Sequence, residues 1–79
     1  MAWRTCNVTW AGPIEDGRIF IRLKVIDGSF ERWFRANPNV QKEMLATALM
    51  SMSSGMRVDA ALPDNLQEWG TCDRLYVHA

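Results

Sequence analysis

The chain has 79 residues, and its nine lysines and arginines balance nine aspartates and glutamates, so the formal net charge is zero. This balance argues against nonspecific nucleic-acid binding, which depends on excess basic charge to neutralise phosphates. A hydrophobic share of 48% argues against disorder and, at this length, predicts one domain over residues 1–79.

Alternating apolar and polar residues predict the first two strands. Cys6, Val8 and Trp10 alternate with polar residues, so we expect them on the buried side of a strand that ends at Gly12-Pro13. After a turn at Asp16-Gly17, residues 18–26 form the clearest alternation in the chain. One side of this second strand carries Ile19, Ile21, Leu23 and Val25, and the other carries Arg18, Phe20, Arg22 and Lys24.

The dipeptide Asp27-Gly28 predicts a two-residue type I′ hairpin between the second and third strands. The resulting register pairs Ile26 with Ser29, Val25 with Phe30, Lys24 with Glu31, Arg22 with Trp33 and Ile21 with Phe34. Lys24 and Glu31 form an exposed pair of opposite charge in this register. Arg32 falls opposite Leu23 on the inner side, so we expect a bulge or an end to pairing near Arg32.

A helix is predicted to start at Asn37-Pro38, with Asn37 as the N-cap, and to end at Ser53, Ser54 and Gly55. Its buried stripe is predicted to contain Val40, Met44, Ala48 and Met52, widened by Leu45 and Leu49. A fourth strand follows with Met56, Val58, Ala60 and Leu62 alternating, then a loop over 66–70 and a fifth strand over roughly 71–78.

The predicted fold is therefore mostly β with one helix, in the order β-β-β-α-β-β. This is the connectivity of the OB-fold, a five-stranded Greek-key barrel with a helix between its third and fourth strands. An open α+β sheet with one packed helix has the same elements and is the alternative.

Catalytic and metal-binding patterns are sparse. His78 is the only histidine, and its place near the end of the chain favours fraying. The spacing of histidine, cysteine and carboxylates matches neither a nucleophile–base pair nor a metal-ligand motif, so we expect no enzyme, no metal and no cofactor.

The sequence also shows neither a membrane-spanning segment nor a secretory signal. No apolar run approaches the roughly 20 residues of a membrane-spanning helix, so no membrane insertion is expected. Residues 1–20 contain no secretory hydrophobic region, which leaves the compartment open between the cytoplasm and secretion after removal of a leader. Cys6 and Cys72 each open a terminal strand, and both a disulfide and two buried free thiols fit this placement.

The helix carries no charged residue between Met44 and Met56, and Ala46, Met50 and Ser53 lie off its main stripe. A helix that is apolar on several sides is covered on several sides, which predicts a homo-oligomer contact at these residues. A solvated face of small residues is the alternative.

The outer side of the central hairpin combines aromatic rings with guanidinium groups: Phe20, Arg22, Trp33 and Arg35. Such a surface suits stacking on a sugar ring or a base, and it equally suits a protein interface, where tryptophan and arginine are favoured.

Several short motifs resemble the B subunits of Shiga-type toxins, a family of small OB-fold proteins that form cell-binding pentamers. They are Cys6 before the first strand, Arg32-Trp33 on the third, Leu45 and Ala48 in the helix, Ser54-Gly55-Met56-Arg57-Val58, and Cys72 before a hydrophobic closing strand. The resemblance implies a non-enzymatic ring of five copies, helices lining its centre, a glycan-binding face and a disulfide between Cys6 and Cys72. Trp33 matches a glycan-stacking residue of that family.

We therefore expect a non-enzymatic binding module that forms a ring-like homo-oligomer and binds a glycan or another small ligand. The alternative is a cytosolic structural or interaction protein in which the aromatic and arginine residues form the subunit interface. Single-stranded nucleic-acid binding suits the fold, but zero net charge weighs against it.

Overall fold

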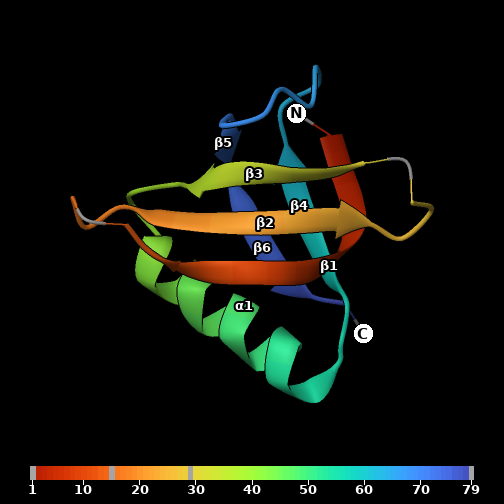
Figure 1. Cartoon of the computed structure of the whole chain (residues 1–79), viewed down its shortest axis with the longest axis horizontal. Helices are drawn as coiled ribbons and strands as arrows, with labels where there is room; N and C mark the ends of the chain where they lie inside the picture. The colour runs from red at the N-terminus through yellow and green to blue at the C-terminus, as the bar shows by residue number, and fades with distance from the viewer. Residues whose placement is uncertain (1, 15, 29, 79) are drawn as a thin grey trace.

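The structure is a computed structural model, which describes residues 2–14, 16–28 and 30–78. Its elements are β1 (Ala2–Pro13), β2 (Ile19–Val25), β3 (Glu31–Ala36), α1 (Gln41–Ser54), β4 (Val58–Leu62), β5 (Thr71–Cys72) and β6 (Arg74–Val77). The mostly β class with one helix, and three strands preceding that helix, are confirmed (Figure 1). The expected fifth strand is divided into β5 and β6 by one residue, Asp73.

The strands form one sheet in the order β5-β3-β2-β1-β4-β6. This sheet is open, so the expected closed barrel is not formed, and the alternative of an open sheet with one packed helix fits. The physical reason lies at Asp73, where the segment changes partner: β5 runs parallel to β3, whereas β6 pairs antiparallel with β4. The Asn37 N–H donates to the Cys72 carbonyl at 3.0 Å, and the Asp73 N–H donates to the Ala61 carbonyl at 2.9 Å.

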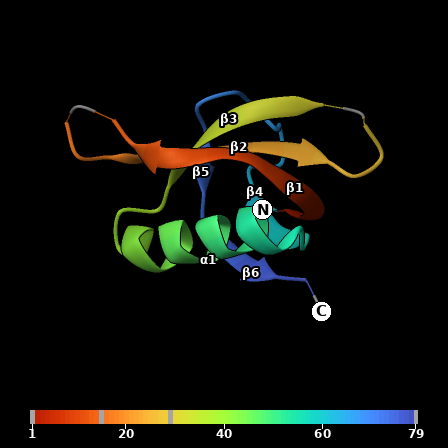
Figure 2. The same cartoon turned by 60° about the horizontal axis from the view of Figure 1, so that its bottom comes forward.

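Strand β1 joins the two parts of the sheet. Its residues Cys6–Pro13 pair with β2 and its residues Ala2–Cys6 pair with β4, so Cys6 faces both Val25 and Val58. In Figure 1, β1, β2 and β3 cross in front of β4 and β6, and Figure 2 shows α1 lying along one side of this arrangement. The core lies between these layers. Its largest fully buried side chains include Phe34, Ile21, Leu23, Leu62 and Val58.

The hairpin register is confirmed from Lys24–Glu31 to Ile21–Phe34, while the expected Ile26–Ser29 pair lies outside the described residues. The type I′ turn is wrong, because Gly28 has φ of 77° and Asp27 is not among the described non-glycine residues with positive φ. The Gly28 N–H instead closes a turn on the Val25 carbonyl at 2.8 Å.

Two expected side-chain arrangements in the hairpin are also corrected. Arg32 stays in regular pairing opposite Leu23 without a bulge, because its Nη1 donates to the Leu66 carbonyl at 2.7 Å and its guanidinium lies over the Phe30 ring. Lys24 and Glu31 are register partners, but the Glu31 carboxylate forms its ion pair with Arg22, at 3.0 Å. The loop that contains Leu66 therefore provides the hydrogen-bond acceptor that the apolar inner side of the sheet cannot give to Arg32.

The helix begins later than expected, with Val40 as the N-cap residue. Asn37 caps a preceding turn instead: its Oδ1 accepts from the Asn39 N–H at 3.0 Å, and its carbonyl accepts from the Val40 N–H at 3.0 Å. Gly55 takes the expected left-handed conformation, with φ of 73°. The 14 residues of α1 are too few to cross a membrane, and no other helix lies in the described residues.

The buried side of α1 differs from the expected stripe. Met44, Ala48 and Ser51 are buried, whereas Met52 and Leu49 are exposed. Ser51 is tolerated because its hydroxyl donates to the Ala48 carbonyl at 2.9 Å, so no polar hydrogen is left unpaired.

Candidate functional site

The four residues expected on the outer side of the hairpin are brought together by β2 and β3. Arg22 is the register partner of Trp33, and Phe20 is the register partner of Arg35. Their neighbours Ile21, Leu23 and Phe34 are fully buried, so alternation directs these four side chains to the opposite side of the sheet.

Trp10 joins this surface, against the expectation that it points into the core. The pairing of β1 with β2 shifts register between Val8 and Trp10, which places Trp10 opposite Arg22. Such a bulge re-aims the side chains that follow it. Because β1 and β3 flank β2, the rings of Trp10 and Trp33 meet across β2, with centroids 4.8 Å apart and planes at 64°.

Trp69 comes to the same surface from the loop between β4 and β5. Its N–H donates to the Trp33 carbonyl at 2.8 Å, and its own φ is 69°. The Trp69 ring lies parallel to that of Trp33, with centroids 5.9 Å apart and 11° between the planes, and its centroid lies 5.2 Å from that of Phe20. The loop is tied to β3 by the Trp33 N–H, which donates to the Glu68 carboxylate at 3.5 Å.

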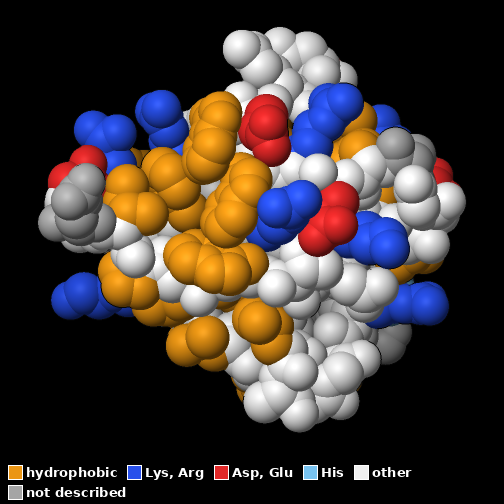
Figure 3. Space-filling view, viewed as in Figure 1, with side chains coloured by type: hydrophobic (Ala, Val, Ile, Leu, Met, Phe, Trp, Pro, Cys, Tyr) orange, Lys and Arg blue, Asp and Glu red, His pale blue; other side chains and the backbone are white. Residues whose placement is uncertain are grey.

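We call the surface formed by Trp10, Phe20, Trp33 and Trp69 the tryptophan face. Trp10 is 39% exposed and Trp69 is 46% exposed, while Phe20 and Trp33 are half-buried. Figure 3 shows hydrophobic side chains gathered over β1, β2 and β3, with basic and acidic groups beside them. The face therefore offers flat apolar area with polar groups at its margin.

Arginine side chains border the tryptophan face at two places. The Arg22 guanidinium lies 5.5 Å from the centre of the Trp33 ring and pairs with the half-exposed Glu31 carboxylate. Among the described residues, the Arg35 guanidinium has neither a hydrogen bond nor an ion pair. The N–H donors of the Arg35 guanidinium are thus available to a ligand.

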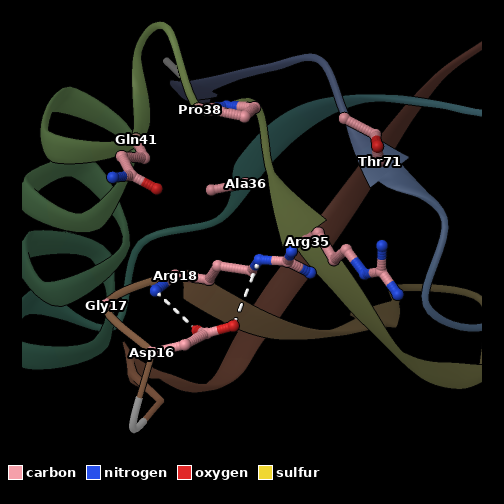
Figure 4. A pocket seen from close by; sticks show the side chains of 8 residues that line it. All are labelled: Asp16, Gly17, Arg18, Arg35, Ala36, Pro38, Gln41 and Thr71. Atoms are coloured by element: carbon pink, nitrogen blue, oxygen red, sulfur yellow. Dashed lines mark hydrogen bonds and ion pairs between the residues drawn. The ribbon is translucent and has the colours of Figure 1, made fainter.

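A pocket of about 420 Å³ adjoins Arg35. It is lined by Asp16, Gly17, Arg18, Arg35, Ala36, Pro38, Gln41 and Thr71 (Figure 4). On one wall Arg18 Nε lies 3.3 Å from Asp16 Oδ2, and the Arg18 N–H donates to Asp16 Oδ1 at 3.1 Å. In Figure 4 the Arg35 guanidinium is directed away from this pair.

The residues expected at an oligomer contact, Ala46, Met50 and Ser53, are all exposed in the single chain. Leu49 and Met50 expose 49% and 52% of their surface. The outer side of α1 is therefore apolar and uncovered.

Cys6 and Cys72 are both buried and both free. Burial raises the pKa of the Cys6 thiol to about 11 and that of the Cys72 thiol to about 12. Neither thiol is a reactive nucleophile at neutral pH in this environment.

A polar cluster lies elsewhere, on β1 and β4. The Asp59 carboxylate accepts from the Thr5 hydroxyl at 2.8 Å, and His78 Nδ1 lies 2.9 Å from Asp59 Oδ2. His78 is therefore docked rather than frayed. These contacts lower the pKa of Asp59, with the His78 contact as the larger cause. No hydrogen bond joins Thr5 to His78 among the described residues, so the cluster lacks the nucleophile–base contact of a hydrolase.

The sequence pattern identified Phe20, Arg22, Trp33 and Arg35 but missed Trp10 and Trp69. Trp10 was missed because uninterrupted alternation placed it inside, and Trp69 because it stands alone in an irregular loop. The signal that remained was the number of large rings, four tryptophans in 79 residues.

Comparison with known proteins gives no relative: no family model matches the chain, and neither the curated proteins nor the solved structures contain a match. The function is therefore argued from the geometry.

Proposed function

We propose that this chain is a non-enzymatic saccharide-binding module, with the tryptophan face as its binding surface and Arg22 and Arg35 at the margin. The observation that carries the proposal is the parallel arrangement of Trp33 and Trp69 on an exposed surface that also holds Trp10 and Phe20.

The chemistry of a sugar ring matches this surface. One side of many pyranose rings presents C–H groups, which pack on an indole, while the hydroxyls at the ring edge need hydrogen-bond partners. Guanidinium groups and the carboxylates of Glu31 and Glu68 provide such donors and acceptors beside the rings. Because the rings are fixed by contact with one another, little side-chain entropy is lost on binding.

We also propose that the fold is OB-like. The helix between β3 and β4, the bent β1 shared by β2 and β4, and the segment 71–77 that pairs with both β3 and β4 support this assignment. OB-folds bind oligosaccharides and oligonucleotides on the face of their second and third strands and on the loops that join the first strand to the second and the fourth to the fifth. The tryptophan face and its neighbouring pocket lie on these same elements.

A saccharide is favoured over a single-stranded nucleic acid by charge. The chain has no net positive charge, and Glu31 and Glu68 flank the rings on which bases would stack. Glu31 is paired with Arg22, so the charges beside the rings offer little compensation for a phosphodiester backbone, which carries one negative charge at every nucleotide.

A glycan array with purified protein tests the proposal. We expect binding to defined saccharides that Trp33→Ala and Trp69→Ala abolish, with Trp3→Ala as the matched control. Trp3 is an exposed tryptophan that stacks on Tyr76, outside the tryptophan face. Absence of any saccharide signal, or equal loss in all three variants, would contradict it.

The exposed side of α1 supports a second proposal, that copies of the chain associate through Ala46, Leu49, Met50 and Ser53 into a ring-like homo-oligomer. Light scattering should give a mass above the 9.0 kDa of one chain, and Met50→Glu should reduce it to that value. A 9.0 kDa species for the unaltered protein would remove this proposal.

The same measurement separates the alternative in which the tryptophan face is the contact between copies. In that case Trp33→Ala, rather than Met50→Glu, would lower the mass. The tryptophan face would then be covered by another copy, and the unaltered protein should bind no saccharide.

A further inference from the structure

We infer that the saccharide bound by this chain carries an anionic group, which pairs with Arg35 at the mouth of the pocket beside the tryptophan face. This inference rests on the proposed saccharide binding and adds the chemical class of the ligand.

Arg35 belongs to both the pocket and the binding surface. It is the register partner of Phe20, whose ring contacts Trp69, and its backbone N–H donates to the Gly70 carbonyl at 2.9 Å. Directly opposing residues on one face of a sheet lie within side-chain contact. A ligand stacked on the tryptophan face therefore reaches Arg35 with its next substituent.

Among the described residues that line the pocket, one arginine has no carboxylate partner. Arg18 is neutralised by Asp16, with which it forms both an ion pair and a backbone hydrogen bond. The Arg35 guanidinium points away from that pair and has neither a hydrogen bond nor an ion pair within the described residues (Figure 4). The described lining thus contains two arginines and one aspartate, which leaves a single positive charge and fits a single carboxylate or sulfate.

The remaining polar lining suits a sugar residue rather than a bare ion. Gln41 and Thr71 provide an amide and a hydroxyl, which pair with sugar hydroxyls. The volume of about 420 Å³ lies in the range of small-molecule sites and exceeds what a carboxylate alone would fill.

The test is an array on which the same neutral saccharide cores are printed with and without a carboxylated or a sulfated residue. We expect the acidic derivatives of bound cores to give about tenfold higher affinity than the neutral cores, as one charge-assisted hydrogen bond provides. Arg35→Gln should bring the acidic derivatives down to the affinity of the neutral cores, whereas Arg35→Lys should keep most of the preference. Arg57→Gln, at an exposed arginine outside the pocket, is the matched control.

The outcomes separate this inference from the proposed function. Equal binding of neutral and acidic derivatives by the unaltered protein would overturn the anionic subsite alone, and no binding to any saccharide would overturn both. Loss of neutral and acidic binding together in Arg35→Gln, with the near-ultraviolet circular dichroism unchanged, would assign Arg35 to the stacking surface and also overturn the subsite. A preference for single-stranded oligonucleotides in competition would overturn the saccharide class. Which acidic derivative binds more tightly identifies the group as carboxylate or sulfate.

Discussion

Trp10 and Trp33 lie on strands separated by β2, yet their ring centroids are 4.8 Å apart. The contact depends on the register shift between Val8 and Trp10, which turns Trp10 away from the core. One irregularity of the sheet thus adds a third indole to a surface that regular pairing would have left to Trp33 and the loop residue Trp69.

Removal of Trp69 should cost more stability than removal of Trp3. Trp69→Ala removes ring contacts with Trp33 and Phe20, whereas Trp3→Ala removes only the stack on Tyr76. At about 0.5–1.5 kcal/mol for each aromatic pair, the ring contacts should account for about 2 kcal/mol of the loss in Trp69→Ala and about 1 kcal/mol of that in Trp3→Ala, in addition to the loss of buried ring area. Urea denaturation measures both. Equal losses would mean that the second ring contact of Trp69 adds no net stability.

Gly70→Ala should displace the loop that carries Trp69. A Cβ at this position would lie 2.9 Å from the Gln67 carbonyl oxygen and 2.9 Å from Pro63 Cγ, so the backbone must move. Gly28→Ala is the comparison, because its positive φ imposes strain but its Cβ meets open space. We expect both variants to lose stability, by about 1–2 kcal/mol for Gly28→Ala. Only Gly70→Ala should shift the tryptophan fluorescence of the native protein, and an unchanged emission maximum would contradict the tight fit at Gly70.

Stability should fall in acid partly through Asp59. Its folded pKa is lowered by the contacts with His78 and Thr5 from an ordinary value of 3.8. A lowered folded pKa contributes stability that is present above pH 3.8 and is lost as the pH falls through the folded value. The free energy of unfolding, measured between neutral pH and pH 3, should therefore depend less on pH in Asp59→Asn. Lys24→Met, which changes an exposed charge away from this cluster, should leave that dependence in place.

The two cysteines should react only after unfolding. Because burial raises both thiol pKa values, to about 11 and about 12, the native protein at pH 8 should react slowly with a thiol reagent. In denaturant without reductant, two thiols for each chain should titrate rapidly. Absence of free thiols under those conditions would instead support the Cys6–Cys72 disulfide that the toxin resemblance implies.

The strand alternation and the hairpin were predictable because each depends on local rules. Arg22 and Trp33 could be paired from the Asp27-Gly28 turn, although the turn itself has another geometry. The start of the helix was predicted too early, because the dipeptide Asn37-Pro38 is as typical of a turn as of a helix N-terminus.

The complete site was not predictable, because two of its rings are placed by tertiary contacts. A bulge leaves no mark in the alternation of Val8 and Trp10, and the position of Trp69 depends on its hydrogen bond to the Trp33 carbonyl, 36 residues back in the chain. The division of the expected fifth strand at Asp73 was not predictable either, because it depends on pairing with two strands that are distant in the sequence.

The change of partner at Asp73 also means that two edges of the sheet stay unpaired until the last residues of the chain are synthesised. As the polypeptide leaves the ribosome, β1 to β4 can pair in the order β3-β2-β1-β4. The outer edges of β3 and β4 have no strand to pair with until residues 71–77 follow. Unpaired strand edges recruit other strands and promote aggregation. Nascent chains that stop before Thr71 should therefore be prone to aggregation, whereas residues 71–77 end the sheet in two short edge strands of two and four residues, which offer little length for such pairing.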